Sequence, residues 1–273
     1  MRHEGCPNLT CDTELIPKEH WEVPSWIDEG IFQESAKILA EHEIQYGAMK
    51  SYHQMCRWNS GLFYKHPALE KVQYYWRVEP KVHFFCDVDY DVFRFMQDSN
   101  KTYGFTINLY DDPNSIPTLW PETTKFLAQH PEYLHESNSM PWLVDSKRRP
   151  DHNLKANGYS TCHFWSNFEI ADMSFWRSQA YEDYFNHLDR AGGFFYERWG
   201  DAPVHSIALG LFEDSSKLHW YVSFNPPPLS PLTIYTYTDL NQVSRHRLPT
   251  HPLLQLPKLA QMQRLHDRPL HGR

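Results

Sequence analysis

The composition changes abruptly at Tyr221, and this change limits how much of the chain can build one common core. Residues 221–273 carry six Lys or Arg against two Asp or Glu, so a chain with a net charge of −8 has −12 on its first 220 residues. The tail contains NPPPLSP and short apolar pairs without a sustained period, a composition typical of irregular structure. We therefore expect one packed domain before the break and an irregular, basic, Pro-rich tail after it.

Helical and strand patterns alternate through the first 220 residues, which predicts a mixed α/β domain. Apolar residues at helical spacing predict a helix over 31–46, with Ser25 or Asp28 as its cap and Gly47 at its end. Further helices are expected over 118–129, 174–189 and 201–211. Runs rich in β-branched and aromatic residues predict strands over 74–78, 82–88 and 103–110.

Several classes of protein are disfavoured by charge and by missing motifs. A pI of about 6.1 and the lack of a dense Lys/Arg run in the body argue against a nucleic-acid partner, because phosphate binding needs a basic face. No apolar run approaches the length of about 20 residues that a membrane-spanning helix needs. Phosphate-binding P-loop, dinucleotide-binding, hydrolase-elbow and zinc-protease motifs do not occur in the sequence.

The stretch from Tyr159 to Trp220 mixes carboxylates with aromatic rings and predicts a binding or catalytic site. Glu169 follows Trp165, Asn167 and Phe168, and burying such a carboxylate is costly unless partners or chemistry require it. Aromatic faces interspersed with polar groups suit sugar rings. Glu169 can therefore face a positive charge that develops at a sugar carbon. The structural alternative is a glutamate that caps a helix or pairs with Arg177.

Two further carboxylates are candidates. Glu79 ends an expected strand, where open α/β sheets place ligand-binding groups, and it can hold a cation such as Mg²⁺ or Mn²⁺ that bridges two phosphates. An ion pair with Arg77 or Lys81 is the alternative. Asp201 is expected to cap the helix over 201–211, whose N-terminus can also bind an anion. The histidines at 163 and 205 are interpreted as hydrogen-bonding or core residues.

Six segments together resemble the fungal α-1,2-mannosyltransferases of glycosyltransferase family 15, namely SYHQMCRWNSGLFYKHP, YYWRVEPKVHFFCDVDYD, YGFTINLYDD, IPTLWPET, CHFWSNFEIADMSFWRS and GGFFYERWGDAPVHSIALGLF. The resemblance implies a GT-A-like α/β fold, a mixed sheet flanked by helices. It also implies a GDP-mannose donor, Mn²⁺, and α-1,2 transfer with retention to mannose on O- and N-linked glycans of cell-wall mannoproteins. A Golgi type II membrane protein is expected.

The resemblance also assigns roles to residues of this chain. Glu169 matches the proposed nucleophile, Tyr52 a tyrosine at the reaction centre, and Glu79 an acidic residue near the manganese and the diphosphate. The residues expected to bind donor or acceptor are Arg57, Trp165, Asn167 and Asp201. Retention is compatible with a mannosyl ester at Glu169. It is equally compatible with acceptor attack on the face that GDP leaves, with Glu169 stabilising charge.

The resemblance covers only part of the chain. We expect a non-homologous leader over 1–15, a partial catalytic domain over 16–220 with an incomplete nucleotide-binding part, and an unrelated tail over 221–273. Lys81 stands where some members carry an aspartate. The alternative function is an inactive fragment that binds a glycan or a protein partner. A glycosidase is less favoured, because hydrolysis needs a second carboxylate within about 5–9.5 Å and the sequence shows no partner for Glu169.

Overall fold

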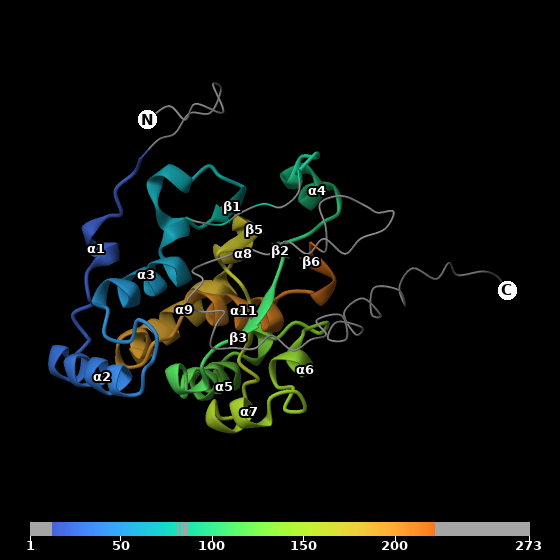
Figure 1. The fold of residues 1–273 in the computed structure, drawn as a ribbon. Coiled ribbons are helices and arrows are strands. Elements are labelled where there is room, and N and C mark those ends of the chain that lie inside the picture. The colour runs from blue at the N-terminus through green and yellow to red at the C-terminus, as the bar shows by residue number, and fades with distance from the viewer. Residues whose placement is uncertain (1–12, 81, 83, 85–86, 222–273) are drawn as a thin grey trace.

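The computed structural model describes residues 13–80, 82, 84 and 87–221, which form a mixed α/β structure (Figure 1). The helices are α1 (Lys18–Trp21), α2 (Glu29–Glu41), α3 (Lys50–Gly61), α4 (Val92–Asp98), α5 (Leu119–Gln129), α6 (Met140–Leu143), α7 (Pro150–Lys155), α8 (Met173–Trp176), α9 (Gln179–Ala191), α10 (Gly193–Tyr196) and α11 (Asp201–Phe212). The strands are β1 (Tyr74–Val78), β2 (Tyr103–Phe105), β3 (Asn108–Tyr110), β4 (Cys162–Phe164), β5 (Phe168–Asp172) and β6 (Leu218–Trp220). Short 3₁₀ turns occupy Phe63–Lys65, Pro67–Leu69, Pro113–Ser115, Pro131–Tyr133 and Ser215–Lys217.

A four-stranded sheet in the order β1-β5-β2-β6 lies at the centre of the described residues. β5 pairs antiparallel with both β1 and β2, whereas β2 and β6 run parallel, so the sheet is mixed. β3 and β4 form a separate antiparallel pair. The middle position of β5 matters for function, because its side chains have neighbouring strands on both sides.

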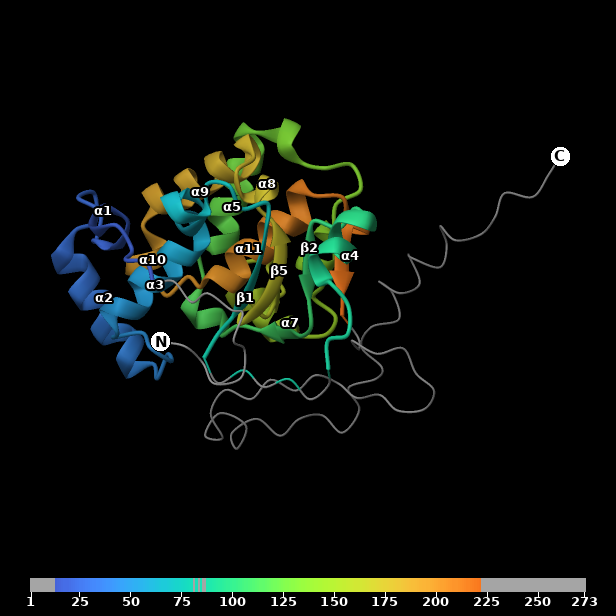
Figure 2. The same ribbon diagram turned by 90° about the horizontal axis from the view of Figure 1, so that it is seen from above.

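The two faces of the sheet are covered by different helices (Figure 2). Alternate residues of a strand point to opposite faces, and on one face Tyr103 and Ala171 join the large core that includes α9 and α11. On the other face Phe168 and Ile170 pack against α4 in a smaller core. Helix α11 is buried along nearly all of its length, as expected for a helix that is apolar on every side.

Local signals in the sequence explain where several helices begin and end. The Asp28 side chain accepts a hydrogen bond from the backbone N–H of Ile31, so Asp28 is the expected cap of α2. Thr118 precedes α5, which runs to Gln129 as predicted. Gly192 ends α9 with a φ of 80°, a left-handed conformation that glycine adopts without steric cost.

The helix predictions differ from the structure in two places. Helix α2 ends at Glu41 instead of residue 46, because Glu43 and Tyr46 take positive φ values that interrupt the helix. The helix expected over 174–189 is divided into α8 and α9, because the Ser178 side chain accepts from the N–H of Tyr181 and starts a new helix.

The strand predictions are confirmed for β1, which has the expected bounds, and corrected elsewhere. The strand expected over 103–110 is two strands, because the chain leaves the central sheet after Phe105 and enters the β3-β4 pair. Residues 82, 84, 87 and 88 are not in a strand, and the rest of the strand expected over 82–88 lies outside the described residues. The predicted tail also lies outside them, apart from Tyr221.

Close packing between α3 and α9 gives a stability prediction. A Cβ added at Gly61 would lie 2.1 Å from the Phe185 ring, closer than any real contact. We expect Gly61→Ala to lower the free energy of unfolding by about 1–3 kcal/mol through overpacking, measured by chemical denaturation. Gly200→Ala is the control, because its Cβ would meet nothing nearer than 3.4 Å. Equal stability of the two variants would contradict this packing.

Candidate active site

Glu169 is the second residue of β5, on the face of the sheet that α11 covers. The antiparallel register pairs it with Arg77 of β1 and with Phe105 of β2. Tyr75 and Tyr103 are two residues away from these partners on their own strands, so they share the same face. The sheet therefore brings an arginine and two tyrosines to one glutamate.

Three side chains hold the Glu169 carboxylate, of which only 1% is exposed. The Tyr75 hydroxyl donates to Oε1 at 2.7 Å, and the Tyr103 hydroxyl donates to Oε2 at 2.9 Å. His205 Nδ1 of α11 lies 3.1 Å from the same Oε2. The carboxylate is thus fixed from both neighbouring strands and from the helix above.

The electrostatic surroundings favour the charged form of Glu169. Burial alone would raise the pKa of its carboxyl group, but His205, Arg77 and the Tyr75 hydroxyl outweigh burial and hold the pKa below the ordinary value. The alternative of a pair with Arg177 is wrong, because Arg177 donates to the carbonyls of Leu69 and Val72.

Arg77 links the other two candidate carboxylates. Its Nε and Nη2 lie 2.8 and 2.6 Å from Oε1 of Glu79, and its Nη1 lies 2.6 Å from Oδ2 of Asp201. Asp201 also accepts from the Ser166 hydroxyl at 2.8 Å. The carbonyl of Asn167 accepts from the Glu79 N–H at 3.0 Å. The structure therefore brings Glu79 and Asp201 to Arg77, beside Glu169, and links Asn167 to this group through the backbone of Glu79.

Asp201 does not cap its helix, contrary to the sequence-based prediction. Gly200 occupies the cap position, and Asp201 is the first residue of α11. Its carboxylate turns instead to Arg77 and Ser166. Burial raises the pKa of Asp201, but the Arg77 guanidinium outweighs burial, so the pKa lies below the ordinary value. The helix still begins at Asp201 as expected, and it continues to Phe212, one residue beyond the predicted end.

Tyr52 lies near this group without touching Glu169. Its ring stacks on Tyr46 with centroids 4.6 Å apart, and the Arg198 guanidinium carbon is 6.0 Å from the ring centroid. Arg198 in turn forms an ion pair of 2.6 Å with Asp111. Burial raises the pKa of the Tyr52 hydroxyl, so the phenol stays neutral at physiological pH. Among the described residues, no hydrogen bond joins Tyr52 to Glu169.

Arg57 and Trp165 lie apart from the Glu169 group. Nε and Nη2 of Arg57 donate to the two carboxylate oxygens of Asp189, at 2.7 and 2.9 Å, in a buried pair that joins α3 to α9. Trp165 is 8% exposed and packs in the smaller core, on the sheet face opposite Glu169. The structure therefore brings four of the seven predicted residues together, with Tyr52 nearby.

Sequence reasoning missed four residues of the site: Tyr75, Arg77, Tyr103 and His205. Arg77 appeared only as an ion-pair partner of Glu79, and that pair is present at 2.6 Å. His205 carried a usable signal, because it follows Asp201 by four residues on a predicted helix and so shares its face. The two tyrosines carried none, since strand order cannot be read from local pattern.

The described residues contain no group of three His, Cys, Asp or Glu side chains that could hold a metal ion. The side chain of Glu79 is 35% exposed, and both of its hydrogen bonds from Arg77 end on Oε1. One accessible carboxylate fits a site in which phosphate oxygens and water supply the remaining ligands of Mn²⁺ or Mg²⁺.

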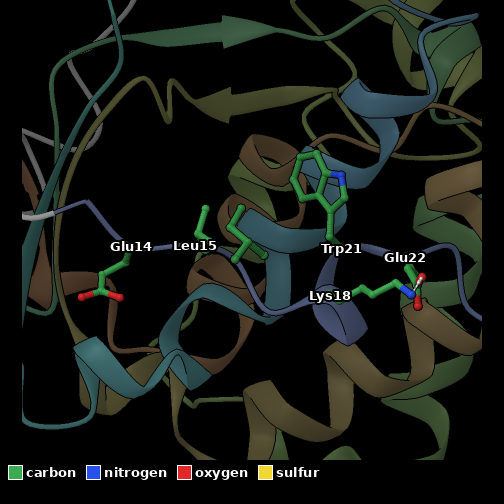
Figure 3. Close-up of a pocket in the computed structure, with 6 residues that line it drawn as sticks. Glu14, Leu15, Lys18, Trp21 and Glu22 are labelled. Carbon is green, nitrogen blue, oxygen red and sulfur yellow. Dashed lines mark ion pairs between the residues drawn. The ribbon is translucent and has the colours of Figure 1, made fainter.

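An open surface hollow of about 640 Å³ lies beside α1 (Figure 3). Lys18 and Glu22 form an ion pair of 3.2 Å on its wall, next to Trp21. None of the residues that hold Glu169 lines this hollow.

Across the described ranges, no helix has the length and apolar character needed to cross a membrane.

Comparison with known sequences gives consistent matches. Residues 9–225 match the family described as glycolipid 2-alpha-mannosyltransferase. Alpha-1,2 mannosyltransferase KTR1 of Saccharomyces cerevisiae is 51% identical over 207 residues, covering 76% of this chain and 51% of the relative. Glycolipid 2-alpha-mannosyltransferase 2 of Candida albicans is 46% identical over 236 residues, covering 86% of this chain and 49% of the relative. The chain spans about half the length of these curated relatives.

Solved structures confirm the GT-A-like mixed α/β fold. Core-mannan synthase A (CmsA/Ktr4) from Aspergillus fumigatus, in its Mn/GDP form, is 70% identical with a TM-score of 0.75, covering 76% of this chain and 55% of that one. The mannosyltransferase Ktr4p from S. cerevisiae in complex with GDP is 48% identical with the same TM-score, covering 76% and 52%. The resemblance seen in the sequence motifs is confirmed, and the chain belongs to the glycolipid 2-alpha-mannosyltransferase family, glycosyltransferase family 15.

Proposed function

We propose that this chain carries the catalytic glutamate of a GDP-mannose-dependent α-1,2-mannosyltransferase that extends mannose on glycoproteins with retention. Family membership supports the reaction and the donor, as do the GDP-bound solved relatives. The observation that carries the proposal is the position of Glu169 on an inner strand of the sheet, where its carboxylate accepts from Tyr75 and Tyr103 and lies 3.1 Å from Nδ1 of His205. A fixed negative charge of this kind stabilises an oxocarbenium-like transition state.

The burial of Glu169 bears on the two routes to retention. For a mannosyl ester to form, Oε1 would have to give up the Tyr75 hydrogen bond, and the sugar carbon would have to reach a carboxylate that is 1% exposed. Oε2 already accepts from Tyr103 and lies next to His205. We therefore favour acceptor attack on the face that GDP leaves, with Glu169 stabilising charge. Tyr52 is then an acceptor-side contact next to Arg198.

The proposal extends to the domain and its location. Residues 16–220 are proposed as the catalytic part of the chain, and the family match over 9–225 contains this range and extends beyond it at both ends. The Golgi lumen is the proposed place of action, supported by family membership. Asp201 and Asn167, which lie around Arg77 with Glu79, are proposed on the donor side.

Glu79 is the proposed protein ligand for Mn²⁺, which when bound would neutralise charge on the departing diphosphate. We expect GDP to bind this chain more tightly with Mn²⁺ than without it, measured by titration calorimetry. Glu79→Gln should weaken the metal-dependent part of the GDP affinity by at least about tenfold, the lower end of the losses in metal affinity seen when residues around a metal site are changed. Glu70→Gln, an exposed acid on the preceding segment, is the matched control.

The same titration tests the whole proposal. If GDP binding is undetectable at millimolar nucleotide with Mn²⁺ present, transfer by this chain is untenable and the inactive glycan-binding alternative is favoured. If GDP binds equally with and without metal, Glu79 loses its role while the transferase proposal stands.

A further inference from the structure

The hydrogen bonds of His205 fix where its protons are. Its Nε2 lies 2.9 Å from the backbone carbonyl oxygen of Asn59 on α3. A carbonyl oxygen only accepts hydrogen bonds, so Nε2 must carry a hydrogen. In a neutral imidazole the other nitrogen, Nδ1, would then have none. Nδ1, however, lies 3.1 Å from Oε2 of Glu169. An unprotonated ring nitrogen and an ionised carboxylate are both acceptors, so they cannot form a hydrogen bond with each other.

One additional proton must therefore lie between His205 and Glu169. Either His205 is a doubly protonated imidazolium beside a carboxylate, or His205 is neutral and Glu169 carries the proton. Both side chains are 1% exposed, so water does not fill the gap between them. The groups that surround the pair decide which of the two side chains carries the proton.

The groups around Glu169 favour the carboxylate. The hydroxyls of Tyr75 on β1 and Tyr103 on β2 both donate to it, and the cation of Arg77 acts on it from β1. Tyr181 of α9 is a neutral phenol whose own hydroxyl is engaged by the carbonyl of Ser60. Hydrogen bonds to the charged form stabilise it, so the two hydroxyl donors and the nearby cation make proton uptake by Glu169 unfavourable.

The groups around His205 favour the imidazolium. The Trp176 ring lies with its centroid 4.3 Å from that of His205, at an interplanar angle of 34°. An aromatic face close to a cation stabilises the cation, most strongly where both are removed from water, and Trp176 is fully buried. Asp201, one turn earlier on α11, adds a negative charge that acts on His205. Phe63 and Tyr181 complete the surroundings with neutral rings.

We propose that His205 is a positively charged positioning residue, which holds Glu169 as a fixed carboxylate in the interior of the protein. The importance of His205 for mannose transfer rests on the role proposed above for Glu169. His205 itself keeps both protons throughout and touches neither sugar nor nucleotide. Without it, Glu169 would lose the strongest of the influences that keep its pKa low against the effect of burial.

Nitrogen NMR of the wild-type chain tests the charge state without any assay of transfer. In protein labelled with ¹⁵N at histidine, both ring nitrogens of His205 should carry hydrogens at pH 7.5, with the signals assigned by their loss in His205→Asn. An unprotonated Nδ1 at that pH would overturn the proposal, because the proton would then be on Glu169. Failure of GDP binding would leave this result untouched, so the two proposals fail separately.

Two substitutions test the positioning role in a transfer assay. His205→Asn places an amide donor near the position of Nδ1 but removes the charge, whereas His205→Gln places its amide near Nε2, toward Asn59. We expect His205→Asn to move the acidic limb of the kcat/KM profile upward by at least about one pH unit, since one unit is the scale of a lost neighbouring charge. His205→Gln should lower the rate of mannose transfer more than His205→Asn does. Unchanged acidic limbs in both folded variants would show a merely structural histidine.

Discussion

Glu169→Gln is expected to lower the rate of mannose transfer by about 10³-fold, the upper range for removing one preorganised electrostatic contact from an active site. Glutamine keeps the shape of the side chain and one acceptor oxygen, but it removes the negative charge that faces the sugar carbon. GDP affinity should stay nearly unchanged, because the described contacts of Glu169 are with protein groups. The measurement is transfer from GDP-mannose to a mannoside acceptor, together with GDP titration.

The control removes the same charge from the surface. Glu34 on α2 is a glutamate whose side chain is 65% exposed, and Glu34→Gln should leave transfer at the wild-type rate. Near-normal turnover in Glu169→Gln would remove Glu169 from the reaction centre. Loss of both transfer and GDP binding would instead indicate a damaged fold, which circular dichroism would reveal.

Arg57→Met is expected to lower the free energy of unfolding by about 3–5 kcal/mol, because it leaves a buried carboxylate without its partner. Asp189 would keep its charge inside the protein after losing both guanidinium contacts, of 2.7 and 2.9 Å. The substitution would also remove the Arg57 bond to the carbonyl of His20, at 3.3 Å. Chemical denaturation measures the change.

An exposed pair of the same chemistry is the matched control. Arg94 and Asp98 lie 3.3 Å apart with side chains 77% and 65% exposed, so Arg94→Met should change stability by at most about 1 kcal/mol. Adding Asp189→Leu to Arg57→Met should recover most of the loss, since an apolar pair of similar volume replaces a buried ion pair without penalty. If folded Arg57→Met binds GDP like wild type, Arg57 joins helices and does not contact the donor. A selective loss of GDP affinity would restore the donor-binding prediction.

Elements with strong local signals were predictable from the sequence. β1 has its expected bounds, because aromatic and β-branched residues end there at a proline turn. Helices α5 and α11 are also close to their predicted ranges. β5, which carries Glu169, was not predicted as a strand, since Glu, Ala and Asp within it disfavour strands locally. Its pairing with one strand on each side, β1 and β2, overrides that preference.

The sequence by itself determined the family and singled out Glu169, because both depend on residues that are adjacent in the chain. Only the tertiary structure decided what surrounds that glutamate. Tyr75, Tyr103 and His205 are 94, 66 and 36 residues away from it. Strand order and helix packing bring them together, and these follow from burial over the whole domain, whereas a local pattern reports only on its near neighbours. The charge of Glu169 is therefore a property of the fold.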